Sequence, residues 1–202
     1  MPMNKRDRKY LTIEGVVVLF GVLIALVVDH ARQQWLEDRE AQIALSRVYL
    51  ELDHNLTQLE DLQTVGTDRL ARLRELRSIE GSEHSLADLM SRFSGYRTPD
   101  LNEAAWNRLV QSRLADSIDP QLLEQAFQIY EANQLFDGLD WEINRLVYSE
   151  LFHSADKRPV AIAISERIMA QQLTWVAEQI PRYAEFLCTA PDDVLIDRPS
   201  TC

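Results

Sequence analysis

The chain has 202 residues, of which 46% are hydrophobic and 26% charged, and its formal net charge is −11. This length predicts one domain, and the apolar share excludes a disordered chain. Two cysteines exclude a disulfide-dense scaffold. We expect no nucleic-acid partner, because contacts with phosphates need Lys and Arg, and this chain is acidic.

The charge is unevenly distributed along the chain. Residues 1–10 carry a net charge of +3, residues 11–28 contain Glu14 as their only charged side chain, and residues 29–202 carry −13. This pattern predicts a basic cytoplasmic tail over residues 1–9 and a transmembrane helix over residues 10–28. A helical extracytoplasmic domain over residues 29–190 and a C-terminal tail over residues 191–202 complete the expected organisation.

The apolar segment from Tyr10 to Val28 forms a helix of about 28 Å, close to the hydrocarbon thickness of a bilayer. Tyr10 and Trp35 are candidate interface anchors, and Glu14 lies one turn from the cytoplasmic end. One alternative is a buried helix of a soluble protein, which the basic flank disfavours. The other is a cleaved signal peptide, which Asp29 disfavours because it stands where a cleavage site needs a small neutral residue. We therefore predict an uncleaved signal anchor in the lipid bilayer.

The orientation follows from the basic residues near the segment. Four Lys and Arg precede it, and only Arg32 and Arg39 fall within the next fifteen residues. The positive-inside rule then places the N-terminus in the cytoplasm and the rest in the periplasm, with the segment in a bacterial inner membrane. In that oxidising compartment Cys188 and Cys202 can form a disulfide; the alternative is two unpaired thiols.

The body is predicted to be all-α, a single N-terminal transmembrane helix continuing into a helical bundle. Leu45, Leu52 and Leu59 repeat every seven residues, which favours one helix from about Tyr10 to Gln63, with a break at Gly66 and Thr67. A shorter helix is expected over residues 70–79. Capping boxes predict helix starts at Ser85 (ending near Phe93) and at Asp100 (covering Trp106, Leu109, Val110 and Leu114), and Asp119–Pro120 predicts a start that runs to about Phe152.

A last helix is expected after Pro159. Its apolar stripe is Ile164, Ile168, Leu173, Val176 and Ile180. Pro181 is expected to kink this helix or to end it near Gln179.

Two features bear on a homodimer. Gly21 and Ala25 form a small-x-x-x-small pair that lets two membrane helices pack closely. The leucine repeat over residues 45–62 can pair two chains as a coiled coil or form the core of one chain. A homodimer and an unidentified protein partner both remain open.

No catalytic or nucleotide-binding motif is present in the sequence. The four histidines, His30, His54, His84 and His153, lack the spacing of a helical metal pair, and acidic pairs such as Asp192–Asp193 are expected by chance. We therefore predict no enzyme activity, no cofactor and no metal site.

Two stretches resemble an uncharacterised family of bacterial single-span membrane proteins. The first contains Lys9-Tyr10-Leu11, Glu14-Gly15, the run from Gly21 to Leu26, and Trp35, with Glu14 and Gly15 in reversed order relative to the family. The second contains Trp106, Leu109, Leu123 and Tyr130. The resemblance implies a short cytoplasmic tail, one span and a helical extracytoplasmic domain, and it implies no activity.

We hypothesise a membrane-anchored bundle that acts through protein–protein interaction, as a scaffold, assembly factor or accessory subunit. The alternative is an extracytoplasmic ligand-sensing bundle that signals through a membrane partner. A pocket lined by convergent polar groups favours sensing, and an exposed apolar patch favours a partner surface.

Overall fold

The computed structural model describes residues 5–77, 83–91, 99–195, 199 and 202, without the side chains of residues 5–18, 135, 137 and 140. These residues form helices, with no strand among them, which confirms the all-α prediction. The helices are α1 (Lys5–Arg77), α2 (Leu86–Met90), α3 (Ala104–Val110), the 3₁₀ helix η2 (Arg113–Ser117), α4 (Pro120–Val147), α5 (Glu150–His153) and α6 (Arg158–Leu187).

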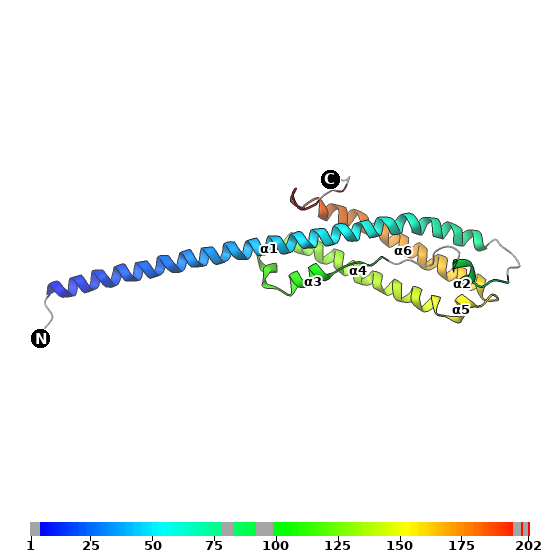
Figure 1. The fold of residues 1–202 in the computed structure, drawn as a ribbon, viewed down its shortest axis with the longest axis horizontal. Coiled ribbons are helices and arrows are strands. Elements are labelled where there is room, and N and C mark those ends of the chain that lie inside the picture. Colours follow the sequence, from blue (N-terminus) through cyan, green and yellow to red (C-terminus); the bar gives the residue numbers. More distant parts are fainter. Residues whose placement is uncertain (1–4, 78–82, 92–98, 196–198, 200–201) are drawn as a thin grey trace.

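Helix α1 is a rod of 73 residues whose first half projects alone and whose second half lies in the bundle (Figure 1). The predicted break at Gly66 and Thr67 is wrong, because the helix continues to Arg77 and includes the shorter helix expected from Leu70. Gly66 is buried, and a Cβ atom there would lie 2.8 Å from Cδ2 of Leu173. The Thr67 hydroxyl donates to the Gln63 carbonyl oxygen (2.7 Å) within the helix instead of capping a new one.

The bundle is built on α6, which runs antiparallel to α1 and packs against both α1 and α4 (Figure 1). One core cluster surrounds Leu52 and Tyr130, and a second, farther from the projecting end of α1, surrounds Leu73 and Ile162. The repeat of Leu45, Leu52 and Leu59 is buried in the first cluster. This repeat is therefore core within one chain rather than an open surface for a coiled coil.

The buried face of α6 follows a heptad pattern that the predicted stripe does not. The buried positions that follow this pattern are Ile162, Ser165, Met169, Gln172, Val176, Gln179, Tyr183 and Phe186, and Ala161 and Leu187 are buried beside them. Ile168 and Val176 of the predicted stripe are buried, whereas Ile164, Leu173 and Ile180 are only half-buried. Of the two outcomes expected at Pro181, an end of the helix near Gln179 is wrong, because α6 continues to Leu187 with its last turns buried in the core.

Helix starts follow the predicted caps in two of three cases. The capping box of Ser85 and Asp88 is confirmed, and Asp119 accepts a hydrogen bond from the Gln121 amide (2.7 Å) at the start of α4. The capping box expected at Asp100 is wrong: α3 begins at Ala104, and no side-chain cap comes from its N-cap residue. Phe93, the expected end of the helix from Ser85, lies outside the described residues.

Helix α4 ends at Val147 rather than near Phe152, and the short helix α5 follows it. Gly138 does not interrupt α4, and apart from the helix's own backbone no atom of the described side chains lies within 4 Å of where its Cβ would be. The three long helices thus give the bundle its shape, and the short segments between them cover its sides.

Candidate functional site

A carboxylate of α1 lies inside the bundle where α1, α3 and α4 meet. Glu51 is 9% exposed, and it accepts hydrogen bonds from the amides of Ala105 (2.7 Å) and Trp106 (3.2 Å). It also accepts one from the Tyr130 hydroxyl (2.7 Å). Three donors therefore surround a buried charge, as a buried carboxylate requires.

This carboxylate caps the second and third amides of α3, whereas the first amide, that of Ala104, donates to Oδ1 of Asn102 (3.2 Å). The first amides of a helix have no partner within the helix and need an acceptor from elsewhere. For α3 that acceptor stands on α1, more than 50 residues earlier in the chain. Glu51 therefore fixes the start of α3 against α1.

Asn55, one turn further along α1, holds the preceding segment. Its side chain donates to the Asn102 carbonyl oxygen (2.9 Å) and accepts from the Asn102 amide (2.9 Å). Both backbone groups of one residue are thereby satisfied by one amide side chain. Because Asn55 is fully buried, this contact positions the backbone just before α3.

Two buried tyrosines extend the polar contacts to α4 and α6. The Tyr183 hydroxyl donates to Oδ1 of Asn133 (2.7 Å), and the Tyr130 ring stacks on Trp106 with centroids 5.0 Å apart. Burial, together with the hydrogen bond to Glu51 and its charge, raises the pKa of Tyr130. Burial also raises the pKa of Tyr183, so both hydroxyls stay protonated. This buried polar layer (Glu51, Asn55, Tyr130, Asn133 and Tyr183) joins the three long helices.

The carboxylate and hydroxyl groups of the buried polar layer are engaged in hydrogen bonds within the fold. Both oxygens of Glu51 are occupied, and the tyrosine hydroxyls donate inward. Within the part of the chain that the structure describes, no group of three or more His, Cys, Asp and Glu side chains could hold a metal ion.

A surface groove of about 670 Å³ lies beside this layer, between α1 and α3. Arg47, Arg108 and Glu51 line it together with Ala44, Ala104, Ala105 and Leu109. Both arginines are exposed at its rim. The groove is open to solvent at the side of the bundle.

The projecting part of α1 exposes apolar side chains on all sides. Every residue from 19 to 28 is exposed, and the large ones among them (Leu19, Phe20, Val22, Leu23, Ile24, Leu26, Val27 and Val28) are between 49% and 68% exposed. Within the described ranges, no helix is both long enough and apolar enough to cross a membrane. The expected span also includes Tyr10 and Glu14, of which the structure describes the backbone but not the side chains.

The remaining predicted residues of α1 are all open to the surroundings. No atom lies within 4 Å of a Cβ built on Gly21, and Ala25 is exposed. Trp35 is 58% exposed, and the Arg39 guanidinium lies 5.5 Å from its ring centroid. The structure therefore does not bring these residues together with the polar layer.

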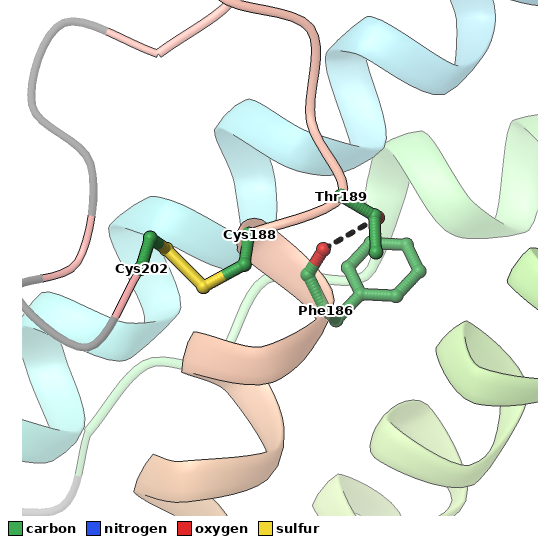
Figure 2. The surroundings of a disulfide bond; sticks show 4 residues. All are labelled: Phe186, Cys188, Thr189 and Cys202. Atoms are coloured by element: carbon green, nitrogen blue, oxygen red, sulfur yellow. Dashed lines mark hydrogen bonds between the residues drawn. A yellow bond between two sulfur atoms is a disulfide. The ribbon is translucent and has the colours of Figure 1, made fainter.

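The C-terminal cysteines are joined in the structure. Cys188, which follows the last residue of α6, forms a disulfide with Cys202, and their Cα atoms are 5.4 Å apart (Figure 2). The Thr189 hydroxyl bonds the Phe186 carbonyl oxygen (2.7 Å) and lies 2.9 Å from the Tyr49 hydroxyl. The end of the chain is thus tied back to α6 and α1.

Sequence reasoning missed Glu51 and Asn55. Asn55 lies between Leu52 and Leu59 on the face of α1 that carries the leucine repeat. A polar residue on this apolar face was the available signal of a buried contact.

Comparison with family models, curated proteins and solved structures found no match to this chain. The resemblance to single-span membrane proteins therefore stays a prediction.

Proposed function

We propose that this chain is a membrane-anchored helical bundle that acts through contacts with other proteins, as a scaffold, assembly factor or accessory subunit. The observation that carries the proposal is the lone stretch of α1 over residues 19–28, which is apolar and exposed all round. A helix that is hydrophobic on every side belongs in an apolar environment rather than in water. The preceding apolar residues from Tyr10 extend the same stretch.

The basic tail supports a defined orientation in a bacterial inner membrane. Lys5, Arg6, Arg8 and Lys9 favour the cytoplasm, which places the bundle in the periplasm. The disulfide of Cys188 and Cys202 agrees with an oxidising compartment for the bundle.

A non-enzymatic role follows from the chemistry of the buried groups. The carboxylate of Glu51 bonds two backbone amides and the Tyr130 hydroxyl, and the Tyr183 hydroxyl bonds the Asn133 side chain. Ligand sensing is a second candidate, and the groove lined by Arg47 and Arg108 favours it. Binding of an acidic small molecule in that groove would raise the melting temperature, and replacing both arginines with Gln would remove the rise.

Reporter fusions test the anchor and its orientation. Alkaline phosphatase fused after Cys202 is expected to be active in a bacterial host, and a fluorescent protein at the same place to stay dark. A matched variant with Lys5, Arg6, Arg8 and Lys9 replaced by Gln should lose part of this bias. A dark phosphatase and a bright fluorescent protein would contradict the orientation.

Crosslinking in intact membranes tests the interaction. The chain is expected to form a specific adduct whose partner is identified by mass spectrometry. A chain that stays uncrosslinked at every exposed position of α1 and of the bundle would contradict a role in protein contacts.

A further inference from the structure

Helix α1 carries a second apolar stripe on the side turned away from the bundle. Leu36, Ile43 and Leu50 are 41%, 50% and 49% exposed and repeat every seven residues. Residues of an α-helix are about 100° apart, so this stripe points about 160° away from the buried seam of Leu45, Leu52 and Leu59. The bundle therefore leaves the stripe uncovered.

The same face of α1 continues into the predicted membrane segment. Ala25 and Ile43 are eighteen residues apart, which is about five full turns, so they share one side of the helix. Gly21 and Leu50 lie within about 20° of each other by the same count. We call this side, marked by Gly21, Ala25, Leu36, Ile43 and Leu50, the outward face; it is about 44 Å long.

Charges on the two flanks of the outward face are complementary to each other. Arg39 lies about 40° to one side of Ile43 and Glu40 about 60° to its other side, since successive residues are about 100° apart. When two copies of α1 lie parallel about a two-fold axis, opposite flanks meet at the same height. Arg39 of each copy then faces Glu40 of the other, giving two ion pairs.

We propose that the outward face of α1 pairs in parallel with the outward face of a second copy of this chain. The proposal rests on the proposed function, because anchoring both copies in one membrane is what makes their α1 helices parallel. Gly21 and Ala25 let the two helices approach closely within the membrane, and Leu36, Ile43 and Leu50 bury one another outside it. The buried seam stays within each chain.

Cysteine crosslinking in membrane vesicles tests the face. Both native cysteines are in the disulfide, so Leu36→Cys or Ile43→Cys introduces the only free thiol of the chain. Mild oxidation is expected to convert most of each variant into a covalent dimer. Asp38→Cys is the matched control, because Asp38 is exposed on the opposite side of α1. Equal crosslinking through Asp38→Cys, or monomeric face variants in the vesicles, would overturn the pairing.

A charge exchange tests the register. In the Ile43→Cys background, Arg39→Glu or Glu40→Arg is expected to lower the dimer yield several-fold, and the double exchange to restore it. Adjacent residues of one helix do not face each other, so restoration reports a contact between chains. Single exchanges without effect, or a double exchange without recovery, would overturn the proposed ion pairs.

The two proposals fail in different ways. A vesicle-bound chain that stays monomeric leaves the anchor standing and overturns the dimer. A chain found only in the soluble fraction overturns the anchor, and the same crosslinking in that fraction then decides the dimer.

Discussion

Glu51 is a charge that the fold keeps because three donors surround it. Two of these donors are backbone amides at the start of α3, and the third is the Tyr130 hydroxyl of α4. Taking a carboxylate out of water costs free energy unless each of its oxygens finds partners. The hydrogen bonds of Glu51 therefore form only when α1, α3 and α4 are packed together.

Glu51→Ala is expected to lower the free energy of unfolding by about 3 kcal/mol, because it leaves two amides and a hydroxyl without an acceptor. Urea unfolding of the full chain in detergent, followed by circular dichroism, measures this. Glu60→Ala, at an exposed position of the same helix, should change stability by no more than about 0.5 kcal/mol. Equal effects of the two substitutions would show that the capping of α3 contributes nothing.

The buried tyrosines predict a loss of stability in alkali. The pKa of Tyr130 is raised in the folded chain, and that of an unfolded tyrosine is about 10. Above pH 10 the unfolded state therefore releases a proton that the folded state retains, and the free energy of unfolding falls by up to about 1.4 kcal/mol per pH unit for each such group. Tyr130→Phe should flatten this fall between pH 10 and 11.5, whereas Tyr148→Phe, at an exposed position, should not.

At the scale of the helices, local signals predicted where elements begin better than how they pack. The caps at Ser85 and Asp119 depend on residues two or three positions away, so the sequence shows them directly. The cap of α3 comes from Glu51 on another helix, and no local pattern reveals it. The buried face of α6 could not be recognised from apolar spacing, because the polar residues Ser165, Gln172 and Gln179 occupy every seventh position of that face.

Gly66 illustrates a second kind of miss, because a helical glycine can mark either a break or a close contact. Here Leu173 of α6 fills the space that a side chain would need. The leucine repeat, the all-α class and the continuity of α1 up to Gln63 were predictable, since apolar spacing alone encodes them. Contacts between distant helices were not.

Gly66→Leu is expected to destabilise the chain by about 2 kcal/mol, because the added side chain displaces Leu173 from a packed site. Gly138→Leu is the matched control: this glycine is also inside a helix, but it is exposed and no described side chain lies within 4 Å of its Cβ position, so better helix propensity should leave stability equal or higher. Thermal unfolding compares the two variants. Adding Leu173→Ala should recover part of the loss caused by Gly66→Leu, and a loss that persists unchanged would contradict the contact.

At the scale of the whole molecule, helix α1 consists of two parts with different surroundings in the structure. Its first part is apolar all round, and its second part is the longest wall of an acidic bundle. The net charge of −11 is a sum over regions of opposite sign: residues 1–10 are basic, whereas residues 29–202 are acidic. The disulfide joins Cys202 to Cys188 just after α6, and the neighbouring Thr189 hydroxyl lies 2.9 Å from the Tyr49 hydroxyl of α1.

The continuity of α1 also sets a distance. The apolar stretch ends at Val28 and the packed core begins at Ala41, and the helix between them is exposed throughout. Thirteen residues of α-helix span about 20 Å. With the anchor in a bilayer as proposed, α1 becomes a rigid spacer that holds the bundle at that height above the lipid surface. A partner embedded in the same membrane can then touch the bundle only if it rises as far, whereas the spacer itself is within reach of any neighbour.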